Sequence, residues 1–422
     1  MMKLDIASYC NREITCSCGH THFCPISTVV VEKGALGKLP GLMEDYAHIL
    51  LVADENTYGT CGDQVKNLLG DKLEDTLIYH SEGLLVPDEK AVAELESHLT
   101  DNTDFIIGIG SGVINDVCKY VAFERKMEYA IIATAPSMDG YASSGAAMIM
   151  GGMKITYTTK PPKMIIADVD VVKNAPMDMI RAGYGDIIGK YSALNDWQLS
   201  HLINDEYFCQ EIYDLVMAVT NEIRDQVELI VARDDEAIEF LTNALVLIGV
   251  TLSLLGSTRP GSGSEHHLSH FFEIVGLIND EPYFLHGTDV AYSTVVTAGM
   301  REELCKIDVP EFITVSPEER KAEYARIYSS YADEVQAIQD KAGSYERDLT
   351  PVYAEKWQEM KDIMSQCPTA AEITKMFTDA GFVMEEFEGM YGAKKIRDAM
   401  FYGKDLKDRY SVLWPYYALI RK

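Results

Sequence analysis

Apolar positions along the chain follow two different patterns. Between residues 28 and 175, six runs have the length and β-branched content of strands, and amphipathic helical segments separate them. The runs are TVVVEKG, HILLVAD, DTLIYHS, FIIGIGSG, YAIIATAP and KMIIADVDVV. Most of them are nearly continuous in apolar character, as parallel strands covered on both faces require. This first pattern predicts a doubly wound, parallel α/β sheet.

After Pro176 the apolar positions recur with the helical period, and there is almost no strand signal. We expect an all-α C-terminal domain, with helices over residues 207–232, 235–255, 317–340, 349–366 and 369–380. The pattern is interrupted at Asn174, Ala175 and Pro176, just before a new helix. We therefore divide the chain into an α/β domain, residues 1–176, and a helical domain, residues 177–422.

Composition places the chain among folded globular proteins. Of its 422 residues, 47 % are hydrophobic and 24 % charged, which argues against disorder or a coiled coil. The 37 basic and 66 acidic residues give a net charge of -29, which repels nucleic acid and anionic membranes. We expect neither nucleic-acid binding nor membrane insertion.

We expect no targeting signal in this chain. Its start, MMKLDIASYC, lacks the pattern of a signal peptide, and the longest apolar run, residues 245–255, is too short to span a bilayer. Nine scattered cysteines fit reduced thiols better than a disulfide framework. These features predict a cytoplasmic protein.

Glycines follow the fourth predicted strand in FIIGIGSGVINDVCKY, residues 105–120. Glycines allow backbone amides to approach a pyrophosphate, and the following helix N-terminus favours an anion, although tight strand-to-helix turns also need glycine. Small hydroxyl residues, Thr134 and Ser137, end the next strand, where doubly wound sheets hold ligands. Asp54 ends the strand ILLVAD, where it would either bind an adenine ribose or form a turn before Glu55. This region predicts a dinucleotide site.

Histidines cluster in SGSEHHLSHFFE and FLHGTDVAY. His266 and His270 share a helix face, whereas His267 points elsewhere, and His286 follows. Asp186 is expected at the start of a helix, just past two glycines, and supplies a carboxylate. One carboxylate and two imidazoles with an open position suit a catalytic divalent metal, although each residue alone would more often be a cap or a core side chain.

Two cations accompany the proposed metal ligands. Lys190 lies one turn after Asp186, and Arg259 lies in GSTRPGSGSEHH. Both could bind a substrate phosphate. The alternative interpretations are that Lys190 is an i,i+4 ion-pair partner of Asp186 and that Arg259 is an exposed surface arginine.

Five segments in order, GIGSGVINDVCK, ATAPSMDGYASSGAAM, AGYGDIIGKYSALNDW, RPGSGSEHHLSH and LHGTDVAY, resemble the glycerol-1-phosphate dehydrogenases. These belong to the superfamily of iron-containing alcohol dehydrogenases, glycerol dehydrogenase and dehydroquinate synthase. The resemblance covers residues 16–300 and implies a dehydroquinate synthase-like fold. It also implies reversible, NAD(P)-dependent reduction of dihydroxyacetone phosphate to sn-glycerol 1-phosphate at a divalent metal, feeding glycerophospholipid synthesis.

The resemblance assigns roles by motif position. It assigns the metal to Asp186, His266 and His286, with His267 left open as an alternative to His266. It assigns the substrate to Asp139, Asp186 and His270. Together with the glycine loop, it places at the dinucleotide Asp54, Gly110, Ser111, Gly112, Asn115, Asp116, Thr134, Ser137 and Ser143. We expect zinc or nickel as the metal and a homodimer as the assembly, and leave open NADH or NADPH.

Two other functions are weighed. A glycerol or other polyol dehydrogenase would lack the phosphate clamp, and a non-catalytic nucleotide-binding sensor would not need the intact Asp/His/His set.

The segment CSCGHTHFC carries a Cys or His at every second position. Neighbours two apart on one strand are separated by about 6 to 7 Å, too far for one tetrahedral ion unless Gly19 reverses the chain. The favoured interpretation is a short strand or hairpin that covers the sheet edge, with a structural zinc as the alternative.

Overall fold

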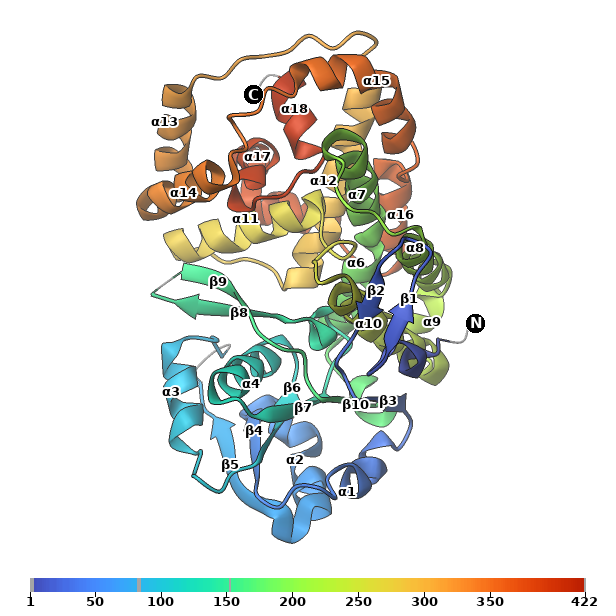
Figure 1. The fold of residues 1–422 in the computed structure, drawn as a ribbon, viewed down its shortest axis with the longest axis vertical. Coiled ribbons are helices and arrows are strands. Elements are labelled where there is room, and N and C mark those ends of the chain that lie inside the picture. Colours follow the sequence, from blue (N-terminus) through green and yellow to red (C-terminus); the bar gives the residue numbers. More distant parts are fainter. Residues whose placement is uncertain (1–3, 82–84, 152, 421–422) are drawn as a thin grey trace. The chain divides into compact units, whose positions relative to one another are not determined.

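The computed structural model describes residues 4–81, 85–151 and 153–420. The chain folds into two compact units. Unit 1 comprises Met1–Tyr184 and Glu228–Ser257, and unit 2 comprises Gly185–Val227 and Thr258–Lys422. Figure 1 shows strands in the first unit and helices alone in the second, within the described residues. The architecture is the predicted one, an α/β sheet followed by a largely helical region.

Unit 1 is built on a six-stranded parallel sheet of order β3-β10-β7-β6-β4-β5. All six predicted strands are present: β3 (Thr28–Glu32), β4 (Ile49–Asp54), β5 (Leu73–Tyr79), β6 (Phe105–Gly110), β7 (Glu128–Ala133) and β10 (Met164–Asp168). The chain runs from β4 outward to β5 and then returns to β6 on the other side of β4. The carboxyl ends of β4 and β6 therefore flank the topological switch point, where open α/β sheets bind ligands.

Helices cover both faces of this sheet. Ile107 and Ile109 of β6 pack in one core with residues of α2, while the glycine between them, Gly108, faces Ile114 and Cys118 of α4. The crossovers through α2 and α4 run in opposite directions along the sheet, so right-handed connections put them on opposite faces. The helices of unit 1 are α1 (Leu39–Leu42), α2 (Glu55–Leu69), α3 (Glu89–Ser97), α4 (Gly112–Arg125), α5 (Val169–Val172), most of α6 (Met177–Ile188) and of α9 (Val227–Val231), and α10 (Asp235–Leu255). Short 3₁₀ helices are η1 (Ile6–Tyr9), η2 (Ala35–Lys38), η3 (Gly70–Lys72) and η4 (Gly140–Ala142).

Two hairpins in unit 1 are separate from the main sheet. They pair β1 (Glu13–Thr15) with β2 (Thr21–Phe23), and β8 (Gly145–Met150) with β9 (Met153–Thr158). The second hairpin was not predicted, because its first strand, GAAMIM, has only one of the β-branched and aromatic residues that mark strands, Ile149.

Helix α10 is the core helix of unit 1. It packs against η4, α5, β2 and β3, and 72 % of its most apolar stretch is buried. At 21 residues with a mean hydropathy of 2.0, it is long and apolar enough to cross a membrane, so our expectation that no segment has that length was wrong. Its burial is that of a helix that is apolar on all sides and lies inside a protein. The division at 176/177 assigns this segment to the helical domain, whereas its apolar surface packs in unit 1.

The part of unit 2 that the structure describes is helical, as predicted, and contains more helices than the ranges we expected. The helices expected over 349–366 and 369–380 are present, and two others are interrupted. The helix expected over 207–232 is divided at Gln226, and that over 317–340 is divided at Ser329, whose φ of 49° is left-handed. The helices are α7 (Lys190–Asn204), α8 (Gln210–Asp225), α11 (Ser264–Asn279), α12 (His286–Cys305), α13 (Pro317–Tyr328), η5 (Ser329–Tyr331), α14 (Ala332–Ala342), α15 (Thr350–Met364), α16 (Ala370–Asp379), α17 (Met384–Tyr402), η6 (Gly403–Leu406) and α18 (Leu413–Leu419).

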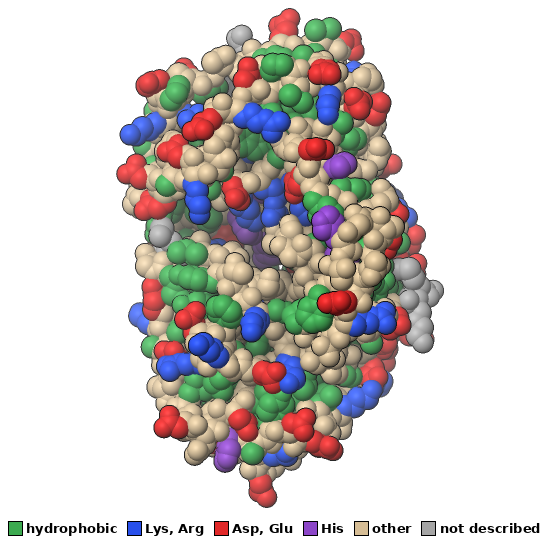
Figure 2. All heavy atoms as spheres, in the orientation of Figure 1, with side chains coloured by type: hydrophobic (Ala, Val, Ile, Leu, Met, Phe, Trp, Pro, Cys, Tyr) green, Lys and Arg blue, Asp and Glu red, His purple; other side chains and the backbone are tan. Residues whose placement is uncertain are grey.

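Charged side chains are spread over the surface. Figure 2 shows acidic side chains over the whole visible face, with basic ones interspersed among them. On this face, the acidic side chains that contribute to the net charge of -29 are not confined to one segment.

Candidate active site

Glycines bring Asp186 to its position in unit 2. Asp186 lies in the last turn of α6, and Lys190 begins α7, so the expectation that Asp186 starts a helix was wrong. A Cβ at Gly185 would lie 2.5 Å from the carbonyl oxygen of Gly287, and one at Gly189 would lie 2.7 Å from Val290. The glycines on both sides of Asp186 thus permit the close approach of α6 to the first turns of α12, rather than breaking the helix.

The structure brings Asp186, His266 and His286 together. One ligand atom from each lies within 4.8 Å of those of the others, and His266 Nε2 is 3.6 Å from Asp186 Oδ1. His266 is in the first turn of α11, and His286 is the first residue of α12. His267 is not part of this cluster: it is fully buried, and neither ring nitrogen has a hydrogen-bond partner among the described residues.

Neighbouring side chains orient both imidazoles. His266 Nδ1 donates to Glu265 Oε1 at 2.7 Å, which leaves Nε2 with its lone pair toward Asp186. His286 Nδ1 is 3.3 Å from the hydroxyl of Ser269. Histidines that bind metals are commonly held in this way through the second ring nitrogen. Sequence reasoning missed these two orienting roles, although Glu265 directly precedes His266.

Charge complementarity holds Asp186 ionised. Its side chain is fully buried, and Lys190 Nζ donates to Oδ1 at 2.8 Å. Burial raises the pKa of Asp186, but the positive charge of Lys190 and the nearby imidazoles outweigh it and bring the pKa down to about 2. A buried carboxylate with two imidazoles is a donor set that fits a divalent cation such as zinc or nickel.

Other predicted groups lie around this cluster or beyond it. The ring centroid of His270 is 5.5 Å from that of His286. Lys190 also donates to the carbonyl of Gly261 at 2.8 Å. Arg259 is buried rather than exposed and contacts both carboxylate oxygens of Glu206 at 3.2 Å. Both expected phosphate ligands therefore have carboxylate partners within unit 2.

One further cation was not predicted. Burial lowers the pKa of His266, and the charges of Lys190 and Lys407 are among those that lower it further. Lys407 follows η6, far along the chain from the histidines, so no local motif marks it.

In unit 1 the predicted dinucleotide residues gather at the carboxyl ends of β4, β6 and β7. The hydroxyls of Ser111 and Ser137 are 2.9 Å apart, and the amide of Thr134 donates to the carbonyl of Gly110. A Cβ at Gly110 would lie 2.6 Å from Ile114, whereas one at Gly112 would meet nothing closer than 3.5 Å. Gly110 therefore serves helix packing, and space remains beside Gly112.

Several of these residues have structural partners. Asp54 forms the capping box of α2, accepting from the amide of Thr57 at 2.8 Å. Asp116 accepts from the amide of Ala147 at 3.1 Å, which ties α4 to β8. Asp54 thus has the turn-forming role that we weighed against ribose binding.

The remaining predicted residues lie around η4. Asn115 Nδ2 donates to the carbonyl oxygen of Gly140 at 3.4 Å, and the Ser143 hydroxyl donates to the same oxygen at 3.0 Å. Asp139 precedes η4 and is buried, and Gly249 of α10 permits the close approach of that helix to its carbonyl oxygen.

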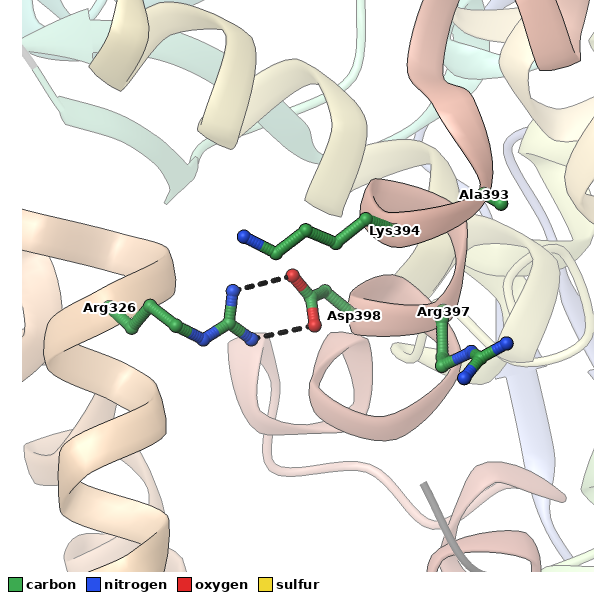
Figure 3. Close-up of a pocket in the computed structure, with 5 residues that line it drawn as sticks. All are labelled: Arg326, Ala393, Lys394, Arg397 and Asp398. Carbon is green, nitrogen blue, oxygen red and sulfur yellow. Dashed lines mark hydrogen bonds and ion pairs between the residues drawn. The ribbon is translucent and has the colours of Figure 1, made fainter.

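A cavity of about 410 Å³ elsewhere in unit 2 contains none of the predicted residues. Arg326 of α13 and Asp398 of α17 line it and form two hydrogen bonds of 2.8 and 2.6 Å (Figure 3). Lys394 and Arg397 also line it, so it is a polar surface pocket distinct from the Asp/His/His cluster.

The structure combines a parallel α/β sheet and a largely helical region with an Asp/His/His cluster that could hold a divalent metal ion, an arrangement compatible with a metal-dependent oxidoreductase. The chain belongs to the iron-containing alcohol dehydrogenase family, whose members use NAD(P) and a divalent metal. The family model described as iron-containing alcohol dehydrogenase matches residues 30–176. The chain is similar to solved glycerol dehydrogenase from Schizosaccharomyces pombe, with a TM-score of 0.55, 16 % identity and coverage of 88 % of this chain and 93 % of that one.

Curated relatives are more similar in sequence. A glycerol-1-phosphate dehydrogenase [NAD(P)+] of Halalkalibacterium halodurans is 33 % identical over 70 % of this chain and 76 % of its own length. The protein of the same name from Bacillus subtilis is 34 % identical over 70 % of this chain and 77 % of its own length.

Proposed function

We propose that the protein reversibly reduces dihydroxyacetone phosphate to sn-glycerol 1-phosphate with NAD(P)H and a divalent metal. The convergence of Asp186, His266 and His286 in unit 2 is the observation that carries this proposal. The names of the relatives support the choice of substrate.

Unit 1 would bind the dinucleotide at the switch point of its sheet. The space beside Gly112 and the N-terminus of α4 would receive the pyrophosphate, because backbone amides there favour an anion. Ser111, Ser137 and Thr134 would add hydroxyl groups from neighbouring strand ends. Asp54 would keep one carboxylate oxygen for the ribose while the other caps α2.

Unit 2 would hold the metal through Asp186, His266 and His286, with Glu265 and Ser269 keeping the imidazoles oriented. When bound, the metal polarises a carbonyl as a Lewis acid, and a reduced dinucleotide supplies hydride.

His270 would donate a hydrogen bond to the substrate or relay a proton to its oxygen, and Asp139 would orient a substrate hydroxyl. The cations proposed for the phosphate are Lys190, Arg259 and Lys407. Only the structure shows that the charge of Lys407 acts on His266. A cytoplasmic homodimer stays a prediction.

A second candidate is a polyol dehydrogenase without phosphate specificity. It is favoured by the ion pairs that already engage Lys190 with Asp186 and Arg259 with Glu206. A phosphate would have to compete with these carboxylates.

The deciding experiment follows NADH and NADPH oxidation with dihydroxyacetone phosphate and, separately, with dihydroxyacetone. Chelator-treated protein is assayed first, and zinc, nickel, cobalt or iron is then restored. We expect metal-dependent turnover that is faster with the phosphate. Faster turnover of dihydroxyacetone would establish the polyol dehydrogenase instead, and nucleotide binding without turnover of either substrate would indicate the sensor.

A further inference from the structure

The β1–β2 hairpin gathers a second set of metal-binding side chains, in unit 1. Gly19 adopts a φ of +85°, and its amide donates to the carbonyl of Cys16. The amide of Cys16 in turn donates to the carbonyl of His20. This tight turn reverses the chain, which is the condition under which alternate residues of CSCGHTH can reach one ion.

The side chains of Cys16, Cys18 and His22 converge as a result. Each offers a ligand atom, and these atoms lie within 4.8 Å of one another. Cys18 Sγ is 3.4 Å from His22 Nε2. Bond lengths of about 2.3 Å to sulfur and about 2.0 Å to nitrogen place such atoms about 3.5 Å apart around a tetrahedral zinc ion. The observed separation is therefore that of two ligands of one zinc ion.

The imidazole of His22 is held in the orientation that a metal ligand needs. Its Nδ1 donates to the carbonyl of Leu254 in α10 at 3.0 Å, and in the neutral ring this leaves Nε2 with a lone pair toward Cys18. His22 and Cys16 are buried, whereas His20, which points out of the same hairpin, is exposed. Figure 1 shows the hairpin beside α10, and β2 packs on that helix.

We infer that Cys16, Cys18 and His22 bind a structural zinc ion. Binding replaces the two thiol protons, which pass to solvent, and joins two thiolates and one neutral imidazole to the cation, with a further donor completing four-coordination. The ion would fix the hairpin, and the hydrogen bond of His22 to Leu254 ties the hairpin to the carboxyl-terminal end of α10. This site is separate from the Asp186 cluster and does not depend on the proposed reaction.

Cobalt spectroscopy tests the site without reference to activity. The whole protein carrying Asp186→Asn is stripped of metal under reducing conditions and titrated with Co²⁺, so that the other cluster is weakened. Thiolate ligands give a near-ultraviolet sulfur-to-cobalt charge-transfer band, which an Asp/His/His site cannot produce. We expect the band to appear and to disappear when zinc is added.

Variants identify the ligands. Cys16→Ser and Cys18→Ser are each expected to remove one thiolate's share of the band, and His22→Asn to weaken cobalt affinity at least about tenfold. Two matched controls should leave both the band and the cobalt affinity unchanged. They are His20→Asn, in the same hairpin, and Cys61→Ser, which replaces a buried cysteine of α2. Serine replacement of each other cysteine then tests whether the fourth donor is a thiolate.

Three results would overturn the inference. They are the absence of a charge-transfer band in folded, reduced protein, a band that keeps its full intensity in both cysteine variants, and a Cys16–Cys18 disulfide detected by mass in protein purified without reductant. Circular dichroism of each variant separates loss of the ion from loss of the fold. A purely structural thiol–imidazole hydrogen bond would give no band and no zinc-dependent rise in melting temperature.

Discussion

The two candidate binding regions are built in different ways. In unit 1 the region at the switch point comes from consecutive strand, loop and helix, and its binding groups are mostly backbone amides and small hydroxyls. In unit 2 the Asp/His/His cluster comes from three helices, and its candidate metal ligands are side chains, of which Asp186 and His266 are buried and His286 is partly buried. A site built from backbone groups tolerates amino-acid substitutions wherever an added Cβ has room. The geometry of a site built from side chains depends on the packing of every helix that contributes one.

The largest expected effect is at Asp186. Asp186→Asn removes the anionic ligand, and we expect metal affinity and kcat to fall more than about 100-fold, beyond the range seen for groups that merely orient ligands. NADH binding should stay nearly unchanged, because the predicted dinucleotide residues lie in unit 1. Metal analysis, steady-state kinetics and NADH fluorescence measure the three quantities.

Asp178→Asn is the control for this variant, since Asp178 is on the same helix with its side chain 80 % exposed. Joint loss of metal and nucleotide binding in Asp186→Asn would point to misfolding and contradict the assignment.

The next largest effect is expected at a buried ion pair that joins helices carrying the cluster. Arg301 of α12 is buried and donates to Asp196 at 2.8 Å, and Asp196 accepts from the amide of Ser264 at the start of α11. Arg301→Met leaves Asp196 buried without its cation, so the free energy of unfolding should fall by about 3 to 5 kcal/mol. Urea denaturation measures this.

The exposed Arg397→Met serves as control and should stay within about 0.5 kcal/mol of the parent. Equal stability of the two variants would show that the ion pair does not hold the helices that carry the histidines.

A smaller effect is expected at Gly185. A methyl group there would lie 2.5 Å from the carbonyl oxygen of Gly287, so Gly185→Ala should separate α6 from α12 and weaken metal binding about tenfold. Gly299→Ala, on α12, is the control. No atom lies within 4 Å of the added Cβ, so this variant should bind metal as the parent protein does. Isothermal titration with Zn²⁺ compares the two. Unchanged affinity in Gly185→Ala would mean that the cluster adapts to helix movement.

The smallest structural perturbation is at Gly112. Its added Cβ meets nothing closer than 3.5 Å, so Gly112→Ala should keep or slightly raise the melting temperature, since alanine favours the helix. The methyl group would nevertheless occupy space proposed for the pyrophosphate and raise the Kd for NADH about tenfold. Unaltered NADH affinity would remove Gly112 from the dinucleotide site.

Local pattern predicted most of unit 1. Apolar, β-branched runs identified the six sheet strands, and the runs are nearly continuous in β4, β6, β7 and β10 because these strands are buried on both faces. The same reasoning missed the β8–β9 hairpin, whose Ala- and Met-rich first strand carries no β-branched signal until Ile149. It also misplaced Asp186 at a helix start, because Gly183 and Gly185 read as helix breakers when they in fact permit close packing.

The amino-acid sequence by itself determined which residue types are available: the glycine loop, the histidine cluster and the alternate cysteines of CSCGHTH all follow from local order. Only the tertiary structure decided which of these meet. It placed His266 rather than His267 beside Asp186, assigned α10 to unit 1 and folded Cys16, Cys18 and His22 onto one another. The physical reason is that such meetings depend on close backbone approaches, at Gly185 and Gly189 for the helices and at Gly19 for the turn, whose partners a linear pattern does not specify.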